Sequence, residues 1–414
     1  MNLDELRSEG DLNISPQRSP WAAECIDAET RDLLDEDAKY FIRQSLSTPC
    51  LDVLRGCSGS WLENMQGRRI LDFHGNNVHQ VGFGNPRVIE AIKSQLELLP
   101  FCTRRYTNVA AIGLAKKLTE LAPGDLNKVL FAPGGTTVIG MALKLARAAT
   151  GRFKTISMWD SFHGASLDAI SVGGEAIFRK GIGPLLAGTE HVPPADPLHC
   201  PFCKEEGSCN LKCADYIEYV LEKEGDVAAV VAETVRSTPF IPPKEYWQRI
   251  RAACDRHGAL LILDESPTCL GRTGTMFACE HYDVVPDMLC IGKGCGGGVF
   301  PLAALLVREG LDVMPERALG HYTHEKNSVA CAAGLATIDC LIEDGVLENA
   351  QARGAQAMGR MQAMQGDFEF IGDVRGLGLL MGIELVKKRN SRERATEDAE
   401  RVMYNALRRG LNFK

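Results

Sequence analysis

The sequence predicts an α/β protein whose mixed, mostly parallel sheet carries helices on both faces. Two short apolar runs, 259–263 and 288–291, end on acidic or glycine residues, a pattern typical of buried parallel strands. From residue 128 to residue 307 such runs alternate with longer amphipathic segments, as in folds built from strand–helix–strand units. With 414 residues, 45% of them hydrophobic, the chain is long enough for more than one subdomain.

The middle of the chain contains most of the expected elements. Helices are expected where apolar residues recur every three or four positions, and strands where a short apolar run lies between turn residues. The segment 74–86 is rich in Gly and Asn and is predicted to be a loop. The predicted helices span 86–98, 110–121, 138–150, 244–257 and 327–344, and the predicted strands span 128–132, 153–159, 227–233, 259–264, 288–291 and 302–307.

The two ends of the chain are predicted to form a smaller α+β domain. Residues 51–71 have the pattern of a short hairpin, and the last part of the chain predicts a helix, a strand at 376–386 and a charged helix at 395–409. We therefore expect an N-terminal segment of the small domain (1–75), a large domain (76–325) with a cysteine-rich insertion (195–215), and a C-terminal part of the small domain (326–414).

Composition argues against several classes of protein. A net charge of −8 disfavours a nucleic-acid surface, which needs clustered Lys and Arg. No uncharged apolar run is long enough to span a bilayer, and residues 1–15 lack the basic and apolar regions of a signal peptide, so we expect a cytoplasmic protein. Several of the 15 cysteines lie in apolar segments and are interpreted as small core residues.

The two central apolar runs each lead into a chemically useful side chain, Asp264 after the first and Lys293 after the second. In open α/β sheets ligands gather at the carboxyl ends of the strands, so we expect both groups in one crevice. A lysine can form a Schiff base with a carbonyl cofactor, and an acid can keep a pyridine nitrogen protonated. The pair therefore predicts pyridoxal phosphate. The alternatives are a loop lysine that holds a phosphate and an Asp that caps a helix.

At these positions the sequence resembles the class III aminotransferases, which are pyridoxal-phosphate enzymes of fold type I. The similarity lies in DESPTCLGRTG at 264–274 and IGKGCGGG at 291–298, and it extends over roughly residues 71–386. The resemblance implies that fold, the cofactor on Lys293 with Asp264 at its ring nitrogen, and a homodimer with shared active sites. It also implies that Thr323 reaches the cofactor phosphate of the neighbouring subunit.

Further cofactor contacts are predicted from the same comparison. Gly135 and Thr136 lie where a strand gives way to a helix, so backbone N–H groups and a hydroxyl can bind an anion there, as in the family's phosphate turn. Phe162 and His163 resemble the family's aromatic-His-Gly segment, in which the aromatic ring stacks on the cofactor. Glu233 matches the glutamate that opens a family segment near the substrate.

The sequence departs from the family pattern at four positions near the site. Pro267 replaces a glutamine near the cofactor phenolate, Cys269 and Cys295 replace small or aliphatic residues, and Ser328 replaces a proline. The chain also ends at Lys414, before the last unit of the family fold, so we expect the small domain to be incomplete.

The predicted substrate wall is polar. His74 and Asn77 replace a more apolar family loop, and Arg104 and Arg105 add two guanidinium groups. Paired arginines suit a doubly charged phosphonate or phosphate, which they bind through bidentate contacts. The alternative is that both arginines are ordinary surface residues beside a helix.

The insertion contains Cys200, Cys203, Cys209 and Cys213, a spacing dense enough for a structural zinc site. The alternative is a set of reduced cysteines without metal.

Three functions remain open from the sequence. The segments 74–86, 103–108 and 133–137 resemble a subgroup of the family that releases ammonia from 2-amino-1-hydroxyethylphosphonate, by way of an aldimine and a quinonoid, so an ammonia-lyase acting on the (R) form is the favoured hypothesis. The first alternative is an ω-amino-acid or amine aminotransferase that uses a keto acid acceptor. The second is a catalytically silent scaffold that binds the cofactor, motivated by Pro267 and Cys269.

Overall fold

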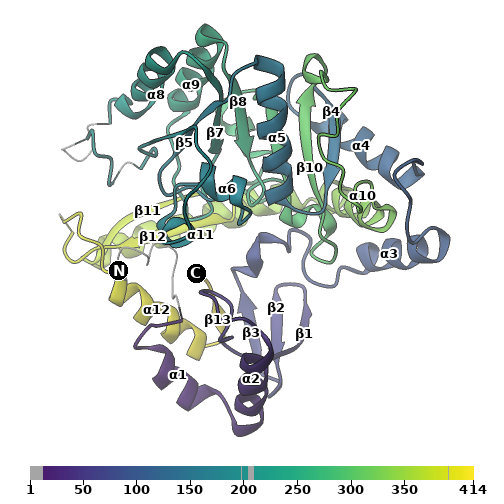
Figure 1. The fold of residues 1–414 in the computed structure, drawn as a ribbon. Coiled ribbons are helices and arrows are strands. Elements are labelled where there is room, and N and C mark those ends of the chain that lie inside the picture. The colour runs from purple at the N-terminus through teal and green to yellow at the C-terminus, as the bar shows by residue number, and fades with distance from the viewer. Residues whose placement is uncertain (1–12, 197, 204–208, 390) are drawn as a thin grey trace.

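The largest layer of the protein is a mixed sheet of seven strands (Figure 1). The computed structural model describes residues 13–196, 198–203, 209–389 and 391–414. The strands are β4 (Leu126–Ala132), β5 (Lys154–Met158), β6 (Thr189–Val192), β7 (Val227–Glu233), β8 (Leu260–Asp264), β9 (Met288–Ile291) and β10 (Ala303–Arg308). They lie in the order β4-β10-β9-β8-β7-β5-β6. Only β10 pairs antiparallel with its neighbours, which confirms the predicted mostly parallel sheet.

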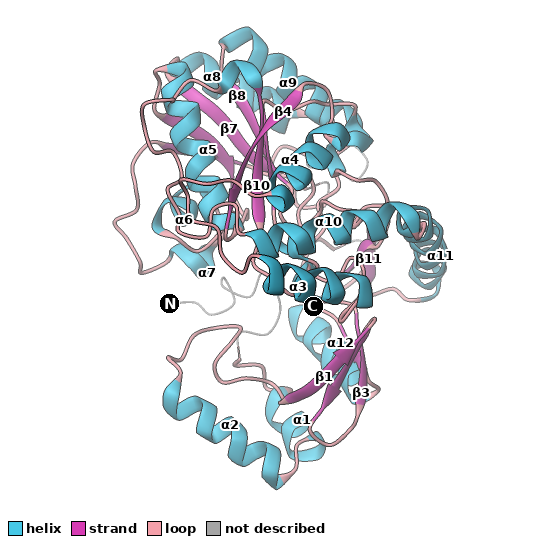
Figure 2. Ribbon diagram, turned by 90° about the vertical axis from the view of Figure 1, so that its right-hand side faces the viewer, coloured by secondary structure: helices cyan, strands magenta, loops and turns pink. Residues whose placement is uncertain are grey.

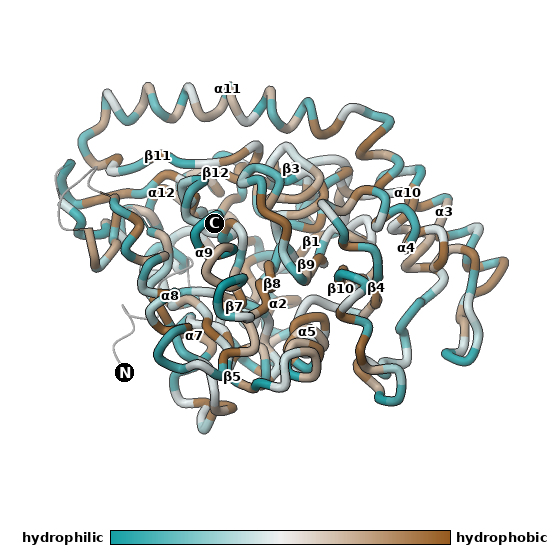
Figure 3. Tube along the Cα trace, turned by 90° about the horizontal axis from the view of Figure 1, so that it is seen from above, coloured by the Kyte–Doolittle hydropathy of each residue, from teal (hydrophilic) through white to brown (hydrophobic). Residues whose placement is uncertain are grey.

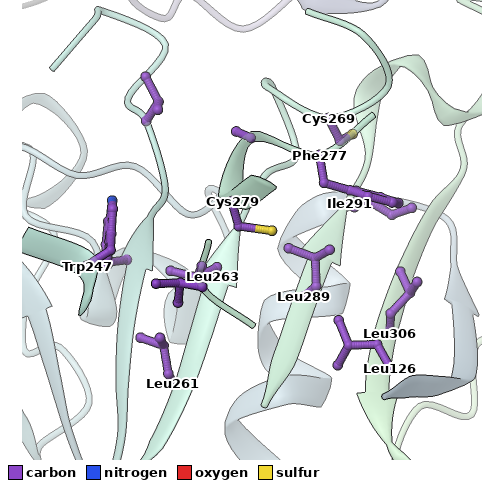
Figure 4. Close-up of a cluster of buried hydrophobic side chains, with 14 of the residues drawn as sticks. Leu126, Trp247, Leu261, Leu263, Cys269, Phe277, Cys279, Leu289, Ile291 and Leu306 are labelled. Atoms are coloured by element: carbon purple, nitrogen blue, oxygen red, sulfur yellow. The ribbon is translucent and has the colours of Figure 1, made fainter. Parts of the chain in front are cut away.

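Helices cover both faces of this sheet (Figure 2). Because side chains alternate along a strand, Ile262 of β8 packs toward α5 (Gly135–Thr150), whereas Leu261 and Leu263 pack on the opposite face. Figure 4 shows this second cluster, in which Leu289 and Leu306 continue the same apolar layer. The helices on that face are α4 (Val109–Leu121), α8 (Lys212–Glu224), α9 (Lys244–His257) and α10 (Ser328–Glu343). Further helices between residues 76 and 325 are α3 (Pro86–Leu98), α6 (Leu167–Val172) and α7 (Ala176–Arg179).

Strands from both ends of the chain share a second, smaller sheet, which lies below the large one in Figure 1. Its strands are β1 (Leu54–Ser58), β2 (Trp61–Asn64), β3 (Arg69–Asp72) and β13 (Leu411–Asn412), in the order β1-β2-β3-β13. The first three are antiparallel, and β13 joins β3 in parallel with Leu411 opposite Leu71. The helices beside this sheet are α1 (Arg18–Cys25), α2 (Ala28–Tyr40) and α12 (Thr396–Arg408).

The long helix α11 (Val346–Asp367) runs beside a hairpin formed by β11 (Ile371–Leu377) and β12 (Leu380–Leu385) (Figure 3). The sequence predicted one strand over 376–386, and this prediction is wrong. The chain reverses at Gly378, whose φ of 55° is left-handed. A Cβ at this position would also collide with the backbone of Thr273, so only glycine fits the turn.

Two further differences from the predictions exceed a shift of one or two residues at the end of an element. Helix α5 begins at Gly135 rather than at residue 138, because Gly134 is already in the extended conformation of an N-cap. Between residues 165 and 226 no elements were predicted, yet the described residues of this part form β6, α6, α7 and α8. Among the described residues, no helix is both long and apolar enough to cross a bilayer.

Candidate active site

Asp264 and Lys293 lie at the carboxyl ends of neighbouring parallel strands. Asp264 is opposite Cys290 in the β8–β9 pairing, and the backbone N–H of Glu265 donates to the carbonyl of Cys290 at 2.8 Å. Lys293 follows β9 by two residues and opens the short helix η4 (Lys293–Gly296) with a left-handed φ of 46°. A non-glycine residue in this region of backbone space carries strain, which is common at functional positions. Both groups are thus presented at one edge of the sheet.

The carboxylate of Asp264 is held by hydrogen bonds on both of its oxygens. Oδ2 is paired with Nδ1 of His163 at 2.9 Å, and Oδ1 accepts from the backbone N–H and the hydroxyl of Ser266 at 3.0 and 2.7 Å. Burial by itself would raise the pKa of Asp264, but the hydrogen bond and charge of His163, together with Ser266, lower it below its ordinary value. Asp264 is therefore a buried carboxylate that remains ionised.

His163 is equally buried and complements this charge. Burial opposes its protonation, but the hydrogen bond to Asp264 and the negative charge there raise the pKa of His163 above its ordinary value. Its other ring nitrogen, Nε2, lies 3.5 Å from the hydroxyl of Ser157 on β5. The predicted cofactor residue His163 thus acts on Asp264.

The turn before α5 has the shape of an anion cradle. Thr136 accepts a hydrogen bond from the backbone N–H of Ser166 at 3.1 Å, and Gly164 packs so closely on Thr136 that a Cβ there would collide with it. A Cβ on Gly135 would lie 3.1 Å from the hydroxyl of Ser266. The first turn of a long helix, lined by glycine and a hydroxyl, favours a phosphate group.

The loop that follows β3 lies over the turn that begins at Lys293. The helix η2 (Gly75–Asn77) contacts η4, and Gln80 packs so closely on Gly294 that a side chain there would collide with it. Gln80 donates to the carbonyl of Asn77 at 3.1 Å. His74 is half-buried, and burial followed by the positive charges of Lys414 and Lys293 lowers the pKa of its imidazole. The predicted substrate residues His74 and Asn77 therefore lie beside Lys293.

Glu233, predicted to be a substrate residue, lies in a buried ion cluster. Its side chain is 6% exposed, Oε2 accepts from the backbone N–H of Phe162 at 3.2 Å, and it lies 3.9 Å from Nε of Arg236. Arg236 also donates to Glu175 at 3.0 Å. Phe162 in turn packs on Phe178, with ring centroids 4.4 Å apart. Glu233 fixes the backbone of Phe162 within this buried ion cluster.

A small pocket of about 40 Å³ opens beside Glu233 and Arg236. Neither Asp264 nor Lys293 is among its lining residues, so we do not assign it to the reaction.

Glu265 is a buried residue whose role the sequence did not reveal. Its carboxylate accepts from the hydroxyl of Thr234 at 2.8 Å and from the backbone N–H groups of Ala278 and Cys279 at 2.6 and 2.7 Å. Burial raises its pKa to about 7 despite these donors. Glu265 therefore ties the end of β8 to the helix η3 (Ala278–Tyr282). Its place directly after Asp264, at the end of an apolar strand, was the available signal.

Three other predicted site residues are exposed on the single chain. Arg104 and Arg105 form a turn between α3 and α4, and Thr323 lies in the loop before α10. The roles predicted for these three residues remain predictions.

The cysteine-rich insertion shows no metal site in the part of the chain that the structure describes. Cys200, Cys203 and Cys213 are buried and Cys209 is exposed. No group of three or more His, Cys, Asp or Glu side chains among the described residues is arranged to hold a metal ion. Nε2 of His199 lies 2.5 Å from Glu384, which joins the insertion to β12. The zinc site and the alternative of reduced cysteines both remain predictions.

The residues present fit pyridoxal phosphate. A lysine on a strained turn, an ionised buried carboxylate on the adjacent strand and a glycine-lined helix N-terminus offer partners for the aldehyde, the ring nitrogen and the phosphate.

Comparison with known proteins points in the same direction. The family model "Aminotransferase class-III" matches residues 43–414. The chain is 48% identical, over 100% of its length and 90% of the relative, to an (R)-1-hydroxy-2-aminoethylphosphonate ammonia-lyase of Vibrio splendidus. It is 35% identical to a leucine/methionine racemase of Thermococcus litoralis, over 92% of this chain and 87% of the relative. An amine transaminase from an uncultivated Pseudomonas species, solved in its PLP-bound form, has a TM-score of 0.83 and 29% identity, with 91% of each chain covered.

Proposed function

The chain belongs to the class-III aminotransferase family of pyridoxal-phosphate enzymes, and we propose that it is an ammonia-lyase acting on (R)-2-amino-1-hydroxyethylphosphonate. The observation that carries this proposal is the 48% identity, over the whole chain, to an ammonia-lyase with that substrate. In the proposed reaction the hydroxyl leaves as water, a second water supplies the aldehyde oxygen, and the products are phosphonoacetaldehyde and ammonia.

The chain has residues for holding the cofactor and for moving the proton in this chemistry. Bound pyridoxal phosphate supplies an electron sink for the charge left when the amine-bearing carbon loses a proton. The amine of Lys293 holds the cofactor and then moves that proton. Asp264, kept ionised by His163 and Ser266, stabilises a protonated ring nitrogen. Thr136 and the N-terminus of α5 bind the phosphate.

Release of ammonia requires no keto acid, and the environment of Glu233 supports this. Arg236 and the backbone N–H of Phe162 already engage this carboxylate, so it has partners of its own within the chain. The alternative, an aminotransferase that passes nitrogen to a keto acid, is favoured by the similarity to a solved amine transaminase. The scaffold hypothesis fits less well, because Lys293 and the buried network around Asp264 are both present.

We also infer that the enzyme is a homodimer with shared active sites. Apolar side chains are strongly exposed around α3 and α4, with Leu98 at 80%, Tyr106 at 72% and Val109 at 88%. These residues fall within twelve positions of the chain, and exposed apolar side chains that gather on a surface commonly mark a protein interface. Arg104 and Arg105 lie in the same segment, so a second subunit seated here would meet them.

The function is tested by supplying the purified holoenzyme with (R)-2-amino-1-hydroxyethylphosphonate and no keto acid. We expect ammonia and phosphonoacetaldehyde in equal amounts, and no product from a Lys293→Ala variant. If nitrogen transfer appears only when pyruvate or 2-oxoglutarate is added, the aminotransferase alternative is correct. A wild-type protein that shows no Lys293-dependent visible absorbance band would support the scaffold hypothesis.

A further inference from the structure

Ser266 lies at the point where three parts of the site meet. Its hydroxyl donates to Oδ1 of Asp264 at 2.7 Å, and its backbone N–H donates to the same oxygen at 3.0 Å. Cβ atoms built on Gly135 and Gly292 would lie 3.1 and 3.4 Å from this hydroxyl. Ser266 therefore touches the phosphate turn on one side and the residue before Lys293 on the other.

The two side chains that hydrogen-bond to Asp264 come from different segments of the chain. His163 reaches Oδ2 from the loop after β5, whereas Ser266 reaches Oδ1 from the segment that follows Asp264 itself. Together they fix the plane of the carboxylate, because each oxygen has its own donor. A buried carboxylate without such donors would become protonated and could not pair with a protonated ring nitrogen.

The small size of the Ser266 side chain matters as much as its hydroxyl for the fit at this position. Ser266 is buried, and both glycines beside it are already close to its side-chain oxygen. A serine fits this space and still supplies a side-chain donor, whereas alanine or glycine would fit and leave only the backbone N–H. The hydroxyl is thus the feature of this residue that acts on Asp264.

We propose that Ser266 is a positioning residue that holds the carboxylate of Asp264 oriented toward the ring nitrogen of the cofactor. This goes beyond the proposed function, because it depends on the family's cofactor and not on the identity of the substrate. A failure of the ammonia-lyase assay would contradict the proposed function but not the role of Ser266. The two proposals can therefore be distinguished.

The test compares Ser266→Ala and Ser266→Gly with Ser266→Thr, which keeps a hydroxyl. Thr268→Val is the matched control, because the hydroxyl of Thr268 is buried two residues away and, in the described structure, has no hydrogen-bond partner. Two properties are measured on each protein: the affinity of the cofactor-depleted enzyme for pyridoxal phosphate, and the pH midpoint of the visible band of the holoenzyme. Thermal unfolding of each variant shows whether it is folded.

We expect Ser266→Ala and Ser266→Gly to bind pyridoxal phosphate roughly tenfold more weakly, since each loses one hydrogen bond to a charged group. The midpoint of the visible band should move to higher pH, because a less protonated ring withdraws less charge from the lysine nitrogen. Ser266→Thr should restore both properties in part, and Thr268→Val should change neither. The proposal is overturned if folded Ser266→Ala and Ser266→Gly keep both wild-type values, or if they change them no more than Thr268→Val does.

Discussion

Nδ1 of His163 lies 2.9 Å from Oδ2 of Asp264, and both side chains are buried. Each group favours the charged form of the other, so the pKa of Asp264 is lowered and that of His163 is raised. The pair therefore stabilises the fold most at pH values between the pKa of Asp264 and the pKa of His163. Its contribution is lost when the pH falls through the lowered pKa of Asp264 or rises through the raised pKa of His163.

The first prediction concerns this pair. Replacement of His163 by Ala removes the donor on Oδ2 and leaves a buried carboxylate with only Ser266 to hold it. We expect the affinity for pyridoxal phosphate to fall by about tenfold or more, as measured by absorbance titration of the cofactor-depleted enzyme.

His163→Asn is the matched control for this variant, since its amide N–H can take the place of Nδ1. It should retain more affinity than His163→Ala. Equal losses in the two variants would show that the ring, and not the hydrogen bond, supports the cofactor.

The second prediction concerns Glu265, whose pKa burial raises from 4.5 to about 7. A raised pKa means that the native state holds the proton more tightly than the unfolded state. Its stabilising effect is complete below the ordinary pKa of the carboxyl and is lost as the pH rises through about 7. Glu265→Gln keeps one acceptor and one donor in place of the protonated acid, and so should remove this dependence.

The measurement is the thermal unfolding temperature of both proteins between pH 5 and pH 8. The wild-type enzyme should lose stability relative to Glu265→Gln across this range, by at most about 3 kcal/mol. Parallel pH profiles for the two proteins would contradict the raised pKa.

Much of the fold and of the central site could be predicted from the sequence, because the residues next to each strand end mark where the strand stops. Apolar runs that stop at Asp264 and before Lys293 indicate both the strands and the groups at their ends. The pairing of Glu233 with Arg236 and Glu175 could not be predicted, since Glu175 is 61 residues from Arg236 and meets it only after β5 and β7 have paired. The reversal at Gly378 was missed because the flanking apolar residues read as one strand.

The third prediction concerns the buried ion cluster. Arg236→Met leaves Glu175 and Glu233 without their shared cation, and both carboxylates are almost fully buried. Removing one partner of a buried ion pair typically costs about 3–5 kcal/mol, so a clear drop in unfolding temperature is expected. The double variant Arg236→Met with Glu175→Gln should recover part of the loss. If the double variant is no more stable than the single one, Glu175 is not the partner that matters.

The fourth prediction concerns the dimer. Val109→Glu places a charge on the exposed apolar surface of α3 and α4 and should weaken self-association, as measured by sedimentation velocity. Tyr219→Glu is the matched control, because Tyr219 is also exposed but lies on α8, at the opposite end of the sheet (Figure 1). If Val109→Glu associates as strongly as the wild type, this surface is not the interface.

The last prediction asks whether an arginine of one subunit serves the active site of the other. Arg105→Met alone should raise the KM for the phosphonate strongly, since a guanidinium suits a doubly charged acid. Mixed dimers of Arg105→Met with Lys293→Ala separate the two geometries. If Arg105 acts across the interface, the mixed dimer contains one site with both an intact Lys293 and an intact Arg105, and activity at low substrate returns. If it acts within its own subunit, each site lacks one of the two groups, and the mixture remains inactive at that concentration. The same mixture made with Arg104→Met determines which of the two neighbouring arginines has this role.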